Sequence, residues 1–164
     1  MYKRQTSDLS VREIAVSPGP SALVVDGNEN IWVLCTSGNL VSIVSAVDLV
    51  GQTITDIAAT GFAEKMAIDR SENIVYYLGG TNDTFTGETN VFMFDLDGAS
   101  QEQEVFIANG FAFYGVGVNP DNGDVYVGDS NAFQSTGTGF RYDNTGMLIS
   151  QFATGIGPNS FLFR

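Results

Sequence analysis

Residues 22–33 read Ala-Leu-Val-Val-Asp-Gly-Asn-Glu-Asn-Ile-Trp-Val, and this stretch decides the fold because its pattern recurs twice along the chain. Residues 65–76 read Lys-Met-Ala-Ile-Asp-Arg-Ser-Glu-Asn-Ile-Val-Tyr, and residues 115–127 read Gly-Val-Gly-Val-Asn-Pro-Asp-Asn-Gly-Asp-Val-Tyr-Val. In each copy a short apolar run precedes a polar turn and then a run rich in β-branched and aromatic residues. Each copy is therefore predicted to be a pair of antiparallel strands.

A second repeated feature follows each strand pair. The pattern Asp-x-x-Gly begins at Asp48, Asp95 and Asp143, which are 47 and 48 residues apart. Asp and Gly suit hairpin turns, because the Asp side chain binds nearby backbone N–H groups and Gly tolerates positive φ. Each unit is thus predicted to hold four strands. The expected strands are 21–26, 31–35, 40–47 and 53–58, then 64–69, 73–78, 90–95 and 103–107, and finally 113–118, 124–128, 139–143 and 147–152.

A period of about 40–50 residues with four strands per unit is typical of a propeller blade. We predict an all-β fold, a single partial β-propeller domain over residues 1–164. Three four-stranded antiparallel blades, at about 21–58, 64–107 and 113–152, form an open arc with one orphan strand at each end. The alternative is a β-sandwich with accidental similarity, and the common order of the repeated features argues against it.

The two ends of the chain are expected to differ. Residues 158–164 echo the first inner strand and are predicted to be a closing inner strand, whose partners come from a segment preceding this chain. Residues 9–15 are predicted to be a lone outer strand. Residues 1–5, Met-Tyr-Lys-Arg-Gln, resemble the translation of a transposon-end adapter from sequencing libraries, so we expect them to be non-native. An arc with two open flanks is expected to self-assemble or aggregate.

The charge of the chain restricts its partners. The 164 residues include 19 acidic and 7 basic side chains and no His, for a net charge of −12. Nucleic acids and anionic membranes need clustered Lys and Arg, so we expect neither as a partner. A solvated acidic surface and cation binding both remain open as explanations of the charge. The single cysteine, Cys35, lies in an apolar run and is expected to be a buried, inert thiol.

The strand pair follows the pattern Pro-x-x-(apolar)-Asp-x-x-(Asn/Gly)-x-(Ile/Val)-(aromatic)-Val, and residues 155–159 read Gly-Ile-Gly-Pro-Asn. These features resemble those of the YncE-like propellers, a bacterial group related to NHL-repeat propellers, and in particular a subgroup of uncharacterised surface lipoproteins. The resemblance covers most of residues 18–164. It implies an extracytoplasmic location, in the periplasm or at the cell surface. It also implies a lipid anchor on a segment outside this chain and a ring of seven or eight blades.

Loop length differs between the two ends of the expected blades. The loops at residues 79–89 and 129–137 are long, and binding residues tend to lie on long loops over a rigid scaffold. Each carries one Phe among Asn, Asp, Thr and Ser, which suits a sugar or a peptide ligand. The alternative is that each Phe only pins its own loop to the blade. The candidate binding residues are Glu64, Lys65, Asn82, Asp83, Phe85, Tyr114, Asp129, Asn131, Phe133 and Asn159.

Little in the sequence points to catalysis. Without His, the chain holds no Ser-His-Asp or Cys-His arrangement, and a zinc site is disfavoured. The segments beginning at Asp26 and Asp95 only partly match a calcium loop. We predict a non-catalytic binding or scaffold module, with no cofactor and no metal site, for a sugar, peptide or protein ligand. The alternative is a lactonase-like hydrolase with a divalent ion on the propeller axis, for which Glu64 and Asn159 are the candidate ligands.

Overall fold

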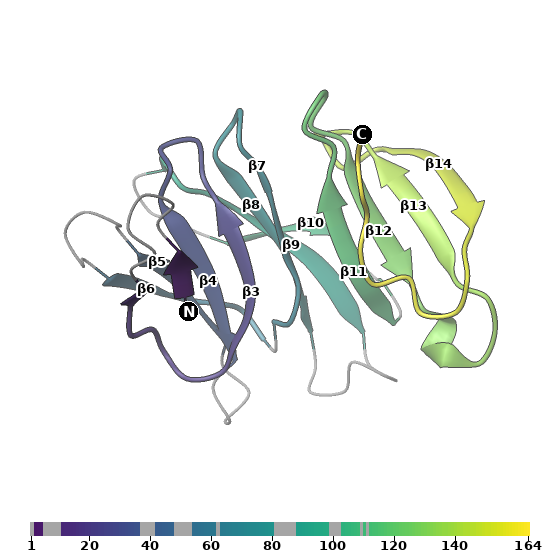
Figure 1. The fold of residues 1–164 in the computed structure, drawn as a ribbon. Helices are drawn as coiled ribbons and strands as arrows, with labels where there is room; N and C mark the ends of the chain where they lie inside the picture. The colour runs from purple at the N-terminus through teal and green to yellow at the C-terminus, as the bar shows by residue number, and fades with distance from the viewer. Residues whose placement is uncertain are drawn as a thin grey trace.

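The computed structural model describes residues 2–4, 11–36, 42–47, 54–61, 63–80, 88–98, 103–108, 110 and 112–164. Within these ranges the chain forms three four-stranded antiparallel sheets and one separate two-stranded pair. The three sheets stand side by side in an open arrangement, with the N-terminus and the C-terminus at opposite ends (Figure 1). The predicted all-β class and the open arc of four-stranded antiparallel sheets are confirmed. We number the sheets blade 1 to blade 3.

Each blade is an up-and-down meander, because every strand pairs with its neighbour in the sequence. The described strands lie within two residues of the expected ones. The strands of blade 1 are β3 (Pro20–Val25), β4 (Ile31–Thr36), β5 (Ser42–Val47) and β6 (Ile54–Ala58). Those of blade 2 are β7 (Met66–Asp69), β8 (Ile74–Gly80), β9 (Thr89–Asp95) and β10 (Glu104–Ile107). Those of blade 3 are β11 (Phe113–Val118), β12 (Val125–Asp129), β13 (Thr138–Tyr142) and β14 (Leu148–Ala153).

Strand β8 shows how the blades pack. The four residues from Val75 to Leu78 are all buried, and their side chains alternate between two cores. Val75 and Tyr77 pack in a core shared with Trp32 of blade 1, whereas Tyr76 and Leu78 pack in a core shared with blade 3. Successive side chains of a strand point to opposite faces, so a strand buried on both faces appears as a continuous apolar run. Blade 2 is therefore enclosed between its two neighbours.

The repeated Asp residues hold the tight turns. The carboxylate of Asp26, which is 2% exposed, accepts hydrogen bonds from the backbone N–H groups of Asn28 and Asn30 and from the Trp32 indole. Burial opposes ionisation of Asp26, but these hydrogen bonds and one from the Asn30 side chain hold its pKa below the ordinary value. Asp143 likewise accepts from the N–H groups of Thr145 and Met147. These carboxylates are structural.

Polar contacts also join the turns of neighbouring blades. The side chain of Arg70 donates to the backbone carbonyl of Asp26 from Nη2 at 3.1 Å. The N–H of Gly27 donates to Oδ1 of Asn73 at 2.8 Å. These bonds connect the β3–β4 turn of blade 1 to the β7–β8 turn of blade 2. The angle between the two blades is thus constrained at the short-loop end as well as in the core.

The N-terminal end differs from the lone outer strand that was expected. Strand β1 (Tyr2–Arg4) pairs antiparallel with β2 (Val11–Glu13), so the described part of this end is a two-stranded pair. Just after it, Ile14 and Val16 pack against Val33 and Cys35 on the outer face of blade 1. Cys35 is 0% exposed, which confirms the expected buried thiol.

Residues 158–164 form a C-terminal tail that lies along the outer face of blade 3, beside β11 and β12 (Figure 1). In the described structure the tail belongs to no sheet, because a strand acquires its ladder only when a neighbouring strand is present. Its contacts come from packing: the Phe161 and Phe163 rings lie 5.6 and 5.1 Å from the Tyr126 ring, between centroids. Residues 158–164 were predicted to be a closing inner strand; in the structure they lie beside blade 3 and form no strand.

Among the described residues, no helix has the length and apolar character needed to cross a membrane.

Candidate functional site

Three of the predicted binding residues meet at the start of the inner strands of blades 2 and 3. Lys65 directly precedes β7, Tyr114 lies in β11, and Phe133 ends the short 3-10 helix η1 (Asn131–Phe133). Nζ of Lys65 lies 5.5 Å from the centroid of the Tyr114 ring. The Phe133 ring meets the Tyr114 ring edge to face, with centroids 4.9 Å apart. We call these three side chains the Tyr114 cluster.

The arrangement of the inner strands brings this cluster together. β7 and β11 are adjacent inner strands, so Lys65 and Tyr114 lie at the same end of neighbouring blades. All three side chains are half-buried, which leaves part of each accessible from outside. An ammonium group over an aromatic face is attracted by the ring quadrupole, by about 0.5–1 kcal/mol at an exposed site. The cluster therefore combines a positive charge, an aromatic ring and a phenol in one place.

The loop that carries Phe133 has an unusual backbone. Asn131, Ala132 and Phe133 have φ values of 49°, 50° and 60°, so three consecutive non-glycine residues are left-handed. This conformation costs an ordinary residue roughly 1–2 kcal/mol. Strain of this kind persists only where the surroundings enforce it, and it concentrates at functional sites. The turn is visible as η1 at the lower end of blade 3 (Figure 1).

Ser130 is the residue that enforces the left-handed turn. It is 0% exposed, and both its N–H and its hydroxyl donate to the carbonyl of Ala112, at 3.0 and 3.1 Å. Its own carbonyl accepts from the N–H of Phe133 at 2.9 Å. Since Ala112 directly precedes β11, Ser130 fastens the turn to the strand that carries Tyr114. Ser130 thus links the backbone of Phe133 to that of Ala112, and this places the Phe133 ring against Tyr114.

The C-terminal tail closes one side of the cluster. Gly157 has a φ of +66°, and a Cβ atom at this position would lie 2.8 Å from the Phe133 ring. A Cβ atom on Gly115 would lie 2.7 Å from the backbone of Asn159 and of Pro158. Glycine at these two positions therefore allows the turn, the tail and β11 to approach one another closely.

A polar network supports the segment that leads to Lys65. Oε1 of Gln103 accepts from the N–H of Thr60 at 2.8 Å and from the hydroxyl of Tyr77. Nε2 of Gln103 donates to the carbonyl of Ala58. The network ties the connection between β6 and β7 to strand β8. Sequence reasoning missed Gln103, because an amide bonding across more than 40 residues leaves no local signal in a single sequence.

The other predicted residues have different places. The carboxylate of Asp129 accepts from the N–H of Asn131, whose side chain donates to the Ser135 hydroxyl, so both residues shape the turn. Glu64 is half-buried next to Lys65, and Asn159 is exposed beside Gly115. The predictions at Asn82, Asp83 and Phe85 lie outside the described residues. Within the part of the chain that the structure describes, no group of three or more Cys, Asp or Glu side chains could hold a metal ion.

No protein-family model and no curated protein sequence matches the chain. Solved structures do match its fold. A quinoprotein alcohol dehydrogenase-like protein from Bacteroides thetaiotaomicron matches with a TM-score of 0.68 at 15% identity, over 89% of this chain and 36% of that one. A gluconolactonase from Xanthomonas campestris matches with a TM-score of 0.66 at 12% identity, over 98% of this chain and 57% of that one.

The β-propeller domain of the trilobed protease from Pyrococcus furiosus, described as having an open velcro topology, matches as well. Its TM-score is 0.61 at 13% identity, over 83% of this chain and 42% of that one. These similarities establish the β-propeller fold, which confirms the predicted architecture, and at such low identity they establish the fold alone. The chain spans about a third to somewhat over half of the length of these three structures.

Proposed function

We propose that the chain is part of a non-catalytic binding module that holds a sugar or a peptide at the Tyr114 cluster. The observation that supports this proposal is the meeting of Lys65, Tyr114 and Phe133 at the end of the arc that carries the long 129–137 loop. An aromatic ring offers an apolar face to the C–H groups of a sugar or to a peptide side chain. The Lys65 ammonium and the Tyr114 hydroxyl supply directional polar contacts beside it.

The rigidity of the site favours binding. Ordering a loop on binding costs free energy, and a loop that is already held in place avoids that cost. Ser130 fastens the left-handed turn to the segment preceding β11, and the tail packs along the same strand. A ligand would therefore meet Phe133 and Tyr114 in fixed positions. This argues for a preformed recognition surface on the described part of the long-loop end.

The binding test uses a glycan microarray and a displayed peptide library as probes. Tyr114→Ala and Lys65→Ala should each weaken the strongest hit by about tenfold or more, because anchors of this type dominate small interfaces. Phe152→Ala is the matched control, since Phe152 is a 42% exposed aromatic side chain on β14, outside the cluster. Equal binding by the wild type and the Tyr114 and Lys65 variants would refute the proposal.

The two phenylalanines of the long loops need a separate measurement. Phe133→Ala and Phe85→Ala should weaken binding while the melting temperature stays close to that of the wild type. If either variant unfolds instead, that side chain only pins its own loop to the blade. Because the Phe133 ring packs on Tyr114 of its own blade, Phe133→Ala should lower the melting temperature slightly without unfolding the protein.

The alternative function is a metal-dependent lactonase-like hydrolase. The similarity in fold to a gluconolactonase supports this alternative. Glu64 and Asn159 would be the candidate ligands of a divalent ion on the propeller axis. Calcium and zinc titrations followed by thermal unfolding separate the two functions, with gluconolactone as the trial substrate. A raised melting temperature together with lactone hydrolysis would support the enzyme. No stabilisation by either metal would count against it.

We further propose that the protein belongs to the YncE-like group and works outside the cytoplasm, attached through a lipid anchor. The support is the strand-pair pattern and the Gly-Ile-Gly-Pro-Asn segment at residues 155–159. Sequencing the intact locus tests this, together with fractionation of cells that express its product. A reading frame without an export signal, or a product found in the cytoplasmic fraction, would refute it.

A further inference from the structure

Lys65 differs from the two other basic side chains of the blades in what it contacts. Arg141 pairs with the carboxylate of Asp124, and Arg70 donates to a backbone carbonyl of blade 1. Lys65 forms no ion pair within the described part of the chain, and its ammonium group lies over the Tyr114 ring. The chain has 19 acidic and only 7 basic side chains, so this lack of a carboxylate partner is not explained by a shortage of carboxylates.

The partial burial of Lys65 makes the missing partner energetically important. Removing an ammonium group from water is unfavourable unless an opposite charge or hydrogen-bond acceptors replace the water. The Tyr114 ring compensates in part, because a cation over an aromatic face gains less than a cation that donates to a carboxylate. An ammonium group has three N–H donors, so Lys65 retains the capacity to bind an anionic group from outside the chain.

The surface beside this ammonium group is largely apolar. The Phe133 ring meets the Tyr114 ring edge to face, and the backbone of Gly157 lies close to Phe133. Ile156, the residue before Gly157, is 66% exposed. A ligand that matches these side chains has an apolar part next to a negatively charged group.

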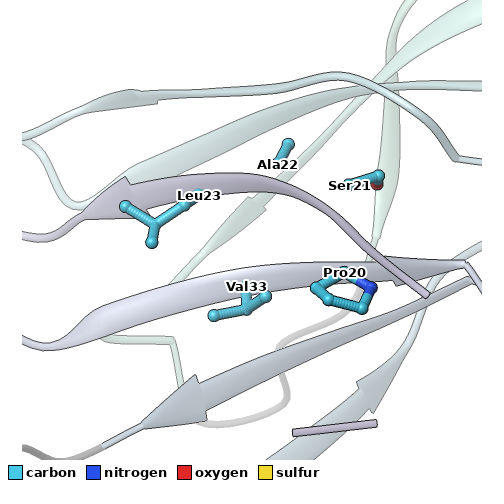
Figure 2. A pocket seen from close by; sticks show the side chains of 5 residues that line it. All are labelled: Pro20, Ser21, Ala22, Leu23 and Val33. Atoms are coloured by element: carbon cyan, nitrogen blue, oxygen red, sulfur yellow. The ribbon is translucent and has the colours of Figure 1, made fainter. Parts of the chain in front are cut away.

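A hollow on blade 1 provides a contrast. It has a volume of about 270 Å³, lies on β3 and β4, and is lined by Pro20, Ser21, Ala22, Leu23 and Val33 (Figure 2). None of these side chains is charged, and Val33 is only 2% exposed because Ile14 and Val16 pack against it. The hollow therefore has no group that selects a ligand by its charge, whereas the Tyr114 cluster has Lys65.

Acidic groups limit how much negative charge the ligand carries. Glu64 precedes Lys65 in the chain, and Asp129 lies at the start of the loop that carries Phe133. The net charge of the chain is −12, which repels polyanions. Salt largely screens charges that are more than about 8 Å apart, so the contact with Lys65 dominates for a small ligand. One carboxylate fits the site better than a string of negative charges.

We propose that the ligand of the Tyr114 cluster carries a single carboxylate, which pairs with Lys65, and an apolar part, which packs on Phe133 and Tyr114. This inference rests on the proposed binding function and specifies the chemical class of the ligand. The carboxylate accepts hydrogen bonds from the ammonium group, and the apolar part covers the aromatic rings. A uronic-acid sugar and a peptide with a free C-terminal carboxylate both have this chemistry.

The experiment compares matched acidic and uncharged probes. A glycan microarray carries uronic-acid glycans beside their methyl esters, and a peptide array carries each peptide as the free acid and as the C-terminal amide. The wild type should bind the acidic form of its strongest hits about tenfold or more tightly than the uncharged form. This preference should fall as the ionic strength rises. Hits confined to one array identify the ligand as a sugar or as a peptide.

Three variants test whether the preference comes from Lys65. Lys65→Gln should abolish the preference for the acidic form, and Lys65→Arg should retain it because the positive charge remains. Arg70→Gln is the matched control, since it removes the same charge at the short-loop end and should leave the preference unchanged. Circular dichroism checks that each variant is folded.

The outcomes separate this inference from the binding function on which it rests. If the wild type binds acidic and uncharged forms equally and Tyr114→Ala weakens both, the binding function stands and the carboxylate inference is overturned. A preference for acids that persists in Lys65→Gln overturns the carboxylate inference as well. Binding of no probe, or binding that Tyr114→Ala leaves unchanged, overturns both proposals.

Discussion

Tyr76 is the residue whose ionisation most directly reports on the packing of blades 2 and 3. It is 1% exposed and meets Phe106 edge to face at 4.9 Å between ring centroids. Burial, aided by the negative charges of Asp69 and Glu72, raises the pKa of Tyr76 from 10.0 to about 12. The side chain is neutral in the fold at a pH where it would ionise in the unfolded chain.

The raised pKa predicts a loss of stability in alkaline solution. The pKa of Tyr76 is higher in the folded state than in the unfolded state. Its contribution to the free energy of unfolding is therefore complete below pH 10 and declines as the pH rises from 10.0 to about 12. Tyr76→Phe should reduce this pH-dependent loss in the free energy of unfolding by on the order of 1–2 kcal/mol, after solvent screening. Urea unfolding at pH 9 and pH 11.5 measures it. A parallel decline in the two proteins would show that Tyr76 is not the cause.

Some turns could be predicted from single residues of the sequence, and the left-handed turn at residues 131–133 could not. Asp143 was expected to hold a turn, because a carboxylate at the start of an Asp-x-x-Gly pattern can accept from nearby N–H groups. Asp26 was singled out only for its partial match to a calcium loop, and the structure shows that its carboxylate also holds a turn. The left-handed turn at Asn131, Ala132 and Phe133 was not expected. Ala and Phe do not favour positive φ, and the turn depends on Ser130, whose burial follows from the packed structure.

At the scale of elements, glycines on the outer face of blade 3 admit the C-terminal tail. Gly115 lies opposite Gly128, and Gly128 lies opposite Gly139, so the three share one face. A Cβ atom on Gly128 would lie 2.4 Å from the carbonyl oxygen of Pro158. Any side chain there displaces backbone atoms of the tail. Gly115 and Gly128 therefore let Pro158 and Asn159 lie against the strands of blade 3, whereas Gly139 accommodates the Phe152 ring.

Gly128→Ala should destabilise the protein by about 1–3 kcal/mol, the usual cost of overpacking, and loosen the tail. The matched control is Gly155→Ala, because a Cβ atom on Gly155 has no neighbour within 4 Å. That change should be neutral or slightly stabilising, since Ala reduces the freedom of the unfolded chain. Urea unfolding and amide exchange of residues 159–163 measure both effects. Equal effects of the two substitutions would contradict this account of the tail.

The strands could be predicted because a blade imposes strong local patterns. A strand such as β8, buried on both faces, needs an unbroken apolar run, and short Asp- and Gly-containing turns separate the runs. The β1–β2 pair was not predicted, since short strands without a repeated partner pattern resemble loops. The residues of the Tyr114 cluster were predicted to share the long-loop end, but their contacts with one another were not predicted. The contacts of the cluster depend on the relative position of β7 and β11. These strands belong to different blades, so the sequence pattern of a single blade does not predict that position.

At the scale of the whole molecule, the blades are stabilised by stacking. The two large cores lie between blades, and both draw on β8, whose side chains alternate between them. The outermost described strand, β14, is exposed at all six residues. An arc of stacked blades thus predicts that the backbone amides are most protected from hydrogen exchange in the middle of blade 2 and least protected at the outer edge of the arc. A two-sheet sandwich would instead leave one face of each sheet in water.

Native-state amide hydrogen exchange of β8 tests the packed arc most directly. The backbone amides of residues 75–78 should exchange only through global unfolding and be the slowest in the chain, whereas those of β14 should exchange through local opening. Denaturant dependence separates the two routes, because global unfolding exposes far more surface. Exchange of residues 75–78 as fast as that of β14, and independent of denaturant, would contradict the arc of stacked blades.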